Sequence, residues 1–80
     1  MSTLIDTATS GRLSDGVFFI RMSSGNEISF PVAENPRLRD ASVEEILDFE
    51  ISPLGIHWPA LDEDLSISGL LQGGWGQAQR

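Results

Sequence analysis

Apolar and polar residues alternate with a period of two in two neighbouring runs of the chain. In residues 17–22 (VFFIRM), Phe18, Ile20 and Met22 fall on one face, and residues 27–32 (EISFPV) repeat the alternation. The intervening SSGN has the composition of a tight turn, so the two runs predict a β-hairpin. Pro31 cannot donate a ladder hydrogen bond, which places it near the end of its strand or at a sheet edge.

The spacing of apolar residues changes to that of a helix after residue 42. Ser42 stands three residues before Glu45, which is a capping-box pattern, and Val43, Ile46 and Leu47 fall on one face. Pro53 and a following glycine end this helix by about residue 50. The preceding residues 33–41 (AENPRLRDA) are interpreted as a polar connection.

The C-terminal third contains short, punctuated segments. GIHW (residues 55–58) predicts a brief strand that Pro59 stops. For residues 61–73 (LDEDLSISGLLQG) we expect an acidic turn, then a few extended residues, then one helical turn at 68–71. The expected architecture is α+β, with a small antiparallel meander sheet of three to four strands packed on one principal helix. This domain spans residues 11–72, between an N-terminal segment (1–10) that either joins the first strand or frays and a flexible glycine-rich tail (73–80).

Composition narrows the class of partner. The 80 residues suffice for one domain, and a net charge of −7 without any lysine counts against nucleic-acid binding, which needs clustered basic residues. The same charge steers a basic protein toward the chain. There is no cysteine, no signal-peptide pattern and no apolar run of the ~20 residues that a membrane helix needs. A cytoplasmic protein is therefore expected.

The residues around the single histidine are the strongest candidates for chemistry. One hypothesis is a metal or ligand site, because imidazole and carboxylates ligate metal ions. Its members would be His57, Asp62, Glu63 and Asp64. Metal sites usually contain more than one His or Cys, and adjacent carboxylates repel each other. We therefore favour a second hypothesis, in which the same stretch closes the fold.

Fold closure assigns structural roles to the neighbouring residues. Trp58 and Leu61 are expected to be buried, with the indole N–H of Trp58 donating to a carbonyl, and Pro59 ends the strand. An aspartate of the acidic run caps the following turn. No nucleophile elbow and no phosphate-binding glycine loop are found, so we expect no catalytic residue, no cofactor and no enzymatic activity.

Several other residues are candidates for binding a partner. Val17 and Phe19 fall on the opposite face of their strand from Phe18, so either another segment covers them or they form an apolar contact patch. Arg37 and Arg39 either meet a partner or pair with the chain's own carboxylates. Trp75 either anchors an interface or lies in a tail that docks on its own domain or does nothing.

Two stretches resemble a known family. They are DGVFFIRMSSGNEISFPVAENPRLRDAS and GIHWPALDEDLSISGLL, and over roughly residues 15–73 they are similar to bacterial domain of unknown function twenty-four forty-two. The resemblance implies an α+β fold with a meandering sheet on one helix. Members occur alone or joined to a helix-turn-helix, and many lie beside a small gene in an arrangement like a toxin–antitoxin pair. Here SGN replaces the DGR of relatives and the helix VEEILDFE is more acidic; with no helix-turn-helix recognised in these residues, DNA binding is not transferred.

The leading hypothesis is a non-enzymatic protein-interaction module, an antitoxin-like partner of a small, basic protein. One alternative is the metal- or ligand-binding domain centred on His57. The other is an acidic inhibitor that mimics nucleic acid, which needs carboxylates arrayed on one face at the spacing of phosphates.

Overall fold

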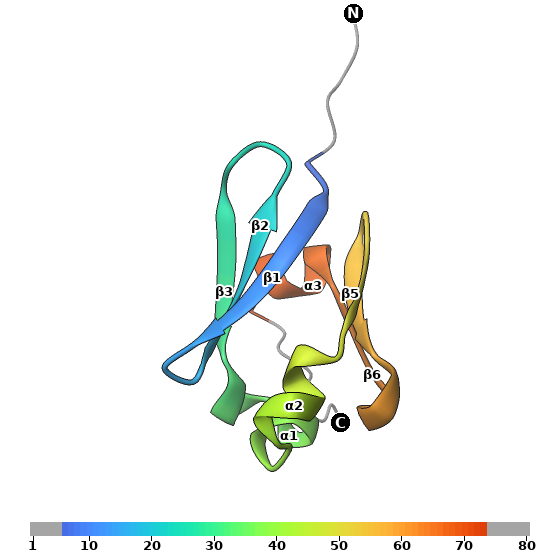
Figure 1. Ribbon diagram of the computed structural model, residues 1–80. Helices are drawn as coiled ribbons and strands as arrows, with labels where there is room; N and C mark the ends of the chain where they lie inside the picture. Colours follow the sequence, from blue (N-terminus) through green and yellow to red (C-terminus); the bar gives the residue numbers. More distant parts are fainter. Residues whose placement is uncertain (1–5, 74–80) are drawn as a thin grey trace, which may run out of the picture.

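A computed structural model of the chain describes residues 6–73 and contains two three-stranded antiparallel sheets, ordered β1-β2-β3 and β4-β5-β6. The two sheets face each other, with two short helices at one end (Figure 1). The strands are β1 (Ala8–Ser14), β2 (Val17–Met22), β3 (Glu27–Pro31), β4 (Glu50–Ser52), β5 (Gly55–Trp58) and β6 (Glu63–Ser66). The helices are α1 (Pro36–Arg39), α2 (Val43–Leu47) and α3 (Ile67–Leu71), with 3₁₀ turns η1 (Val32–Glu34) and η2 (Pro59–Leu61).

The predicted hairpin is present as β2 and β3, in a register that pairs Phe18 with Phe30. β1 adds a third strand, joined to β2 by Asp15 and Gly16, whose φ angles of 50° and 77° match the left-handed positions of a tight hairpin turn. A register shift between Ala8 and Ser10 interrupts the alternation in β1. This irregularity explains why the sequence pattern did not show the strand clearly.

The expectation of one principal helix is wrong. α2 begins at the predicted capping box, in which the Glu45 backbone N–H donates to Ser42 Oγ (3.1 Å) and the Ser42 N–H donates to Glu45 Oε1 (3.0 Å). It ends at Leu47, and the chain then enters β4. Helices of four or five residues are too short to cover a sheet, so the second sheet buries the first instead.

The predicted polar connection also contains a helix. In α1 the Oδ1 atom of Asn35 accepts the backbone N–H groups of Arg37 and Leu38, both at 2.9 Å, and Pro36 occupies the first helical position. Proline suits that position because its missing N–H would have no partner there. Leu38 is fully buried, which ties this segment to the core.

The core lies between the two sheets and centres on aromatic rings. Phe18 packs against Phe30, Phe49 and Trp58 with ring centroids 5.3 to 5.8 Å apart. Around them lie the other buried apolar residues: Ala8, Ile20, Met22, Val32, Leu38, Ile46, Ile56, Leu65, Ile67 and Leu70. Packing between the two sheets therefore holds together the domain on which the candidate sites lie.

Candidate functional site

The segment after β5 attaches the second sheet to the helices. Trp58 is fully buried, and its indole N–H donates to the backbone oxygen of Ile46 in α2 at 2.8 Å. Pro59 opens η2 and is exposed, whereas Leu61 is half-buried against the core. These contacts support the fold-closing role for this stretch.

Glu63 has an inward-facing role that the sequence did not reveal. It is 8% exposed, and its Oε2 accepts a hydrogen bond of 2.8 Å from the side-chain amide of Asn35. Arg37 Nε lies 3.6 Å from the other carboxylate oxygen, and Arg37 Nη1 donates to the Leu61 carbonyl at 3.2 Å. A carboxylate with a hydrogen bond and a cation beside it is a tolerable buried group. Glu63 therefore joins β6 to the beginning of α1.

His57 and Asp64 lie on the other side of the second sheet. The Nδ1 atom of His57 is 2.5 Å from Asp64 Oδ1 and 3.1 Å from the Glu63 backbone oxygen. Successive strand residues point to opposite faces, so Glu63 and Asp64 cannot converge. Asp62, at a φ of 52°, is an exposed residue that ends η2.

The four residues of the metal hypothesis are thus divided between two faces. Within residues 6–73, no group of three or more His, Cys, Asp or Glu side chains is arranged to hold a metal ion. The close His57–Asp64 contact is a cross-strand pair of β5 and β6.

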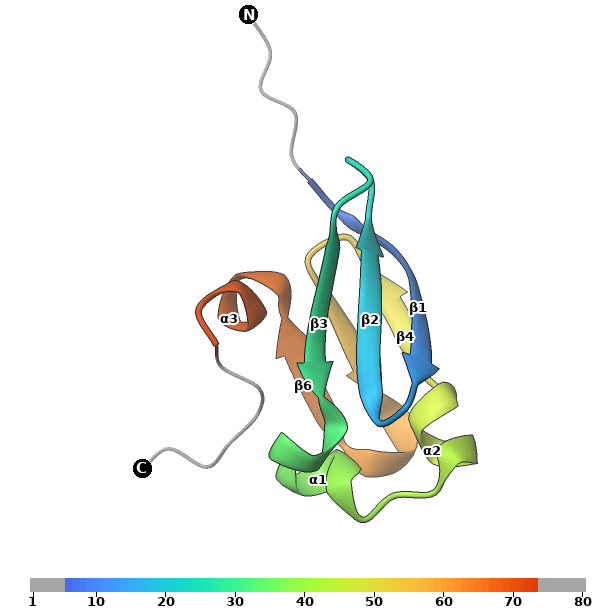
Figure 2. The same cartoon turned by 90° about the vertical axis from the view of Figure 1, so that its left-hand side faces the viewer.

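The outer face of the β1-β2-β3 sheet carries Val17 and Phe19, both half-buried. In the register Phe19 lies between Arg12 and Ser29, and Val17 is paired with Pro31 on β3. In Figure 2 the second sheet lies behind this face, α3 lies to one side and α1 and α2 lie below, and no described helix or strand crosses in front of it. With their intermediate burial, Val17 and Phe19 are therefore partly accessible from solvent.

Two arginines border these apolar residues. The Arg12 guanidinium lies 4.0 Å from the centroid of the Phe19 ring, a cation–π contact. Arg12 and Arg21 also share one carboxylate, with Glu27 Oε2 at 3.5 and 3.7 Å. We call the set Arg12, Val17, Phe19, Arg21, Glu27 and Pro31 the outer sheet face. Neither arginine was singled out from the sequence, although strand alternation places Arg21 beside Phe19.

The other proposed partner residues lie elsewhere. Arg37 is engaged with Glu63 and Leu61, and Arg39, on the same helix α1, lies 3.9 Å from its neighbour Asp40. The structure therefore does not bring Arg37 and Arg39 together with Val17 and Phe19. Trp75 and most of the predicted tail lie outside the described residues.

Comparison with known proteins identifies the family. The model of the family described as protein of unknown function (DUF2442) matches residues 12–75. The chain belongs to this family. No curated protein matches the DUF2442 chain.

Two solved structures are similar to it. One is the crystal structure of a protein of unknown function from Rhodospirillum rubrum, with a TM-score of 0.81, 28% identity, and coverage of 92% of this chain and 94% of that one. The other is the solution NMR structure of an uncharacterized protein from Chromobacterium violaceum, with a TM-score of 0.78, 30% identity, and coverage of 90% and 70%. These similarities support a small mixed α/β domain, and they indicate no catalytic family. No helix in the described part of the chain is long and apolar enough to cross a bilayer.

Proposed function

We propose that this DUF2442 chain is a non-enzymatic protein-interaction module that acts like an antitoxin by binding one small, basic protein at its outer sheet face. The observation that carries the proposal is the partial solvent access of Val17 and Phe19 on a face that Figure 2 shows uncovered by the described elements. The solvent face of an antiparallel sheet is normally polar. An apolar patch with a polar border is typical of an interaction site.

The residue types of the outer sheet face suit an interface. Aromatic and arginine side chains are enriched among the residues that contribute most to protein–protein binding. Phe19 is already stacked beneath Arg12, so a partner meets a pre-ordered ring and guanidinium and orders few side chains on binding.

Charge acts on this partner at two ranges. The net charge of −7 attracts a basic protein from a distance and speeds association. At contact, Arg12 and Arg21 share a single carboxylate, so their guanidinium groups have donors left for carbonyl or carboxylate oxygens of the partner. A small basic protein with an apolar contact surface and a few such acceptors fits both requirements.

The outer sheet face is small. Three strands of about six residues cover an area of about 20 Å by 10–15 Å, or roughly 200–300 Å². A standard interface buries about 800 Å² on each partner. A stable complex therefore extends past the edge of the sheet.

The test is capture of the partner followed by substitution. A tagged chain is expected to retain one small basic protein in stoichiometric amount from its native host. Phe19→Asp and Val17→Asp are each expected to weaken that complex by at least 30-fold, about 2 kcal/mol, the loss typical of a central contact residue. Both variants should still unfold cooperatively, because these side chains lie outside the core cluster.

Leu54→Asp is the matched control. Leu54 is 65% exposed in the turn between β4 and β5, so the same change in polarity and charge there should leave binding unaltered. Equal binding by wild type and Phe19→Asp would refute the proposed surface. Loss of folding in Phe19→Asp would show instead that this face belongs to the core.

A further inference from the structure

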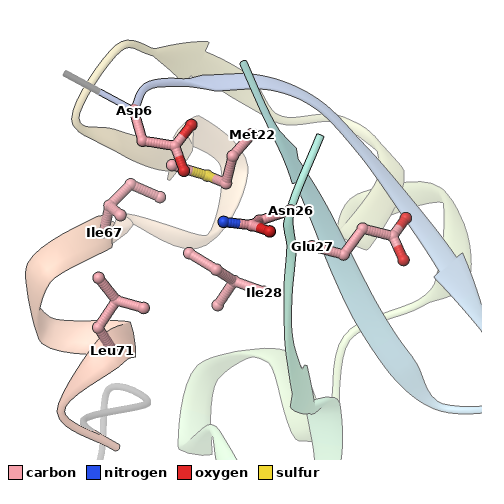
Figure 3. A pocket seen from close by; sticks show the side chains of 7 residues that line it. All are labelled: Asp6, Met22, Asn26, Glu27, Ile28, Ile67 and Leu71. Atoms are coloured by element: carbon pink, nitrogen blue, oxygen red, sulfur yellow. The ribbon is translucent and has the colours of Figure 1, made fainter. Parts of the chain in front are cut away.

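A pocket of about 260 Å³ opens between α3 and the end of the β2–β3 hairpin (Figure 3). Its apolar lining consists of Met22, Ile28, Ile67 and Leu71, which converge from the hairpin and from α3. Leu71 is 70% exposed and Ile28 is half-buried, whereas Met22 and Ile67 are buried, so the pocket has an accessible rim above a buried apolar base. Sites for small molecules measure about 300–1,000 Å³, and this smaller volume suits one large side chain.

Asp6 supplies the charge at the rim of this pocket. Its carboxylate accepts hydrogen bonds from the Ser24 hydroxyl (2.7 Å), the Ser24 backbone N–H (2.9 Å) and the Ser23 hydroxyl (3.2 Å). The Ser24 hydroxyl, then the Ser24 amide, hold the pKa of Asp6 below its usual value. The carboxylate is therefore charged at neutral pH and held in a fixed direction.

No described cation neutralises Asp6. Among residues 6–73, the ion pairs involve other carboxylates, including Glu27 with Arg12 and Arg21. Figure 3 shows the Glu27 carboxylate directed away from the pocket, and the Asn26 amide directed into it. The donors to this carboxylate are all uncharged groups, namely the Ser24 hydroxyl and amide, the Ser23 hydroxyl and the Asn26 side-chain amide, so its negative charge is left for a cationic ligand.

We infer that this pocket holds an apolar side chain of the basic partner, while a neighbouring lysine or arginine of the same segment binds the Asp6 carboxylate. The inference rests on the proposed function and names a second contact of that complex. A partly open apolar lining beside a carboxylate that no cation of residues 6–73 neutralises is complementary to a segment that is apolar and cationic together. A second copy of this chain is a poorer occupant because its own charge of −7 opposes association.

The pocket lies next to the outer sheet face, which is too small by itself for a stable interface. Glu27 belongs to both sites, since its residue lines the pocket and its carboxylate pairs with the arginines of that face. A partner that passes over the β3 edge therefore reaches the pocket and gains contact area that the sheet alone does not offer.

The test is an NMR titration of the ¹⁵N-labelled full chain with capped five-residue peptides. The probe has the sequence Gly-Arg-Leu-Arg-Gly, and its charge-reversed counterpart has glutamate in place of both arginines. The arginine peptide is expected to shift the amide signals of Ser24, Asn26, Ile28 and Leu71 in a saturable manner. The glutamate peptide should cause no saturable shift.

Asp6→Asn removes the charge while keeping the shape and one of the two oxygens that accept from Ser24. It should weaken binding of the arginine peptide by about fivefold, the upper range for an exposed ion pair. Asp15→Asn is the matched control, since it removes one exposed charge at the distant β1–β2 turn and should change affinity by less than about twofold.

The outcomes separate the two proposals. Saturable shifts in the pocket that Asp6→Asn weakens support the inference. Shifts confined to residues 17–21 would overturn the pocket as a binding site and leave the outer sheet face as a proposal. If the peptide instead shifts the pocket residues while Phe19→Asp leaves capture of the partner unchanged, the outer sheet face is overturned and the pocket is supported. Absence of any shift, or equal binding of both peptides, would overturn the inference.

Discussion

Replacing Asn35 by alanine tests whether the buried polar contact between the second sheet and α1 stabilises the domain. Asn35 is fully buried and acts in two directions. Its Oδ1 accepts the N–H groups of Arg37 and Leu38 at the beginning of α1, and its amide donates to Glu63 in β6. Alanine removes both functions.

The expected cost follows from these two losses. Removing an N-cap side chain costs about 1 kcal/mol, with a range of roughly 0.5–2. Removing a hydrogen bond to a charged, buried group costs about 1.5–3 kcal/mol. The sum is about 2–5 kcal/mol, against a total free energy of unfolding of about 4–12 kcal/mol for a domain of this length. Asn35→Ala should therefore have a much lower urea midpoint and be partly unfolded near the lower end of that range.

The assay is urea unfolding followed by tryptophan fluorescence, with two comparisons. Ser42→Ala removes the cap of α2, which has no buried carboxylate behind it, and should cost only about 1 kcal/mol. A double-mutant cycle of Asn35→Ala with Glu63→Gln should show a coupling energy of about 0.5–3 kcal/mol. A loss below about 0.5 kcal/mol for Asn35→Ala, or no coupling to residue 63, would refute this account of how the acidic segment closes the fold.

Three further predictions concern other sites. Gly55→Ala should lower the free energy of unfolding by about 1–3 kcal/mol, because a Cβ there would lie 2.7 Å from the Leu65 carbonyl oxygen of the paired strand; a urea midpoint equal to wild type would contradict this close approach. The carboxyl carbon of Asp6 should titrate in NMR with a pKa below 3.8, because the Ser24 hydroxyl and amide stabilise its anion. Since this pKa is lowered by folding, the associated stability is present above the unfolded value and lost as the pH falls through the folded one, and a value at or above 3.8 would argue against these bonds in solution. Zinc should leave the melting temperature unchanged within about 1 °C, and a rise that His57→Ala abolishes would restore the metal hypothesis.

The prediction of sites from the sequence succeeded where neighbouring residues share one strand. Val17 and Phe19 could be assigned to one face from the period of two alone. Arg12 could not be added, because its place over the Phe19 ring depends on the register of a strand whose alternation is interrupted. The same period of two places Glu63 and Asp64 on opposite faces of their strand. The sequence did not predict this, because these residues were expected to form an acidic turn and they form the beginning of β6 instead.

The pocket beside Asp6 was not predictable. Its lining comes from both ends of the described chain, and residues 6 and 71 are brought together only by the packing of α3 beside the hairpin. No local pattern reports such a contact.

The sequence by itself determined the β2–β3 hairpin, the capped start of α2, the brief strand β5 and the family, because hydrophobic period, capping chemistry and proline act over a few residues. Tertiary structure decided that a second sheet, and not a long helix, covers the first. It also decided that Asn35 and Glu63, 28 residues apart, form one buried pair. The physical reason is that a short helix or a three-residue strand has almost no stability alone. Which of the two a segment forms is therefore decided by how it packs against the rest of the chain.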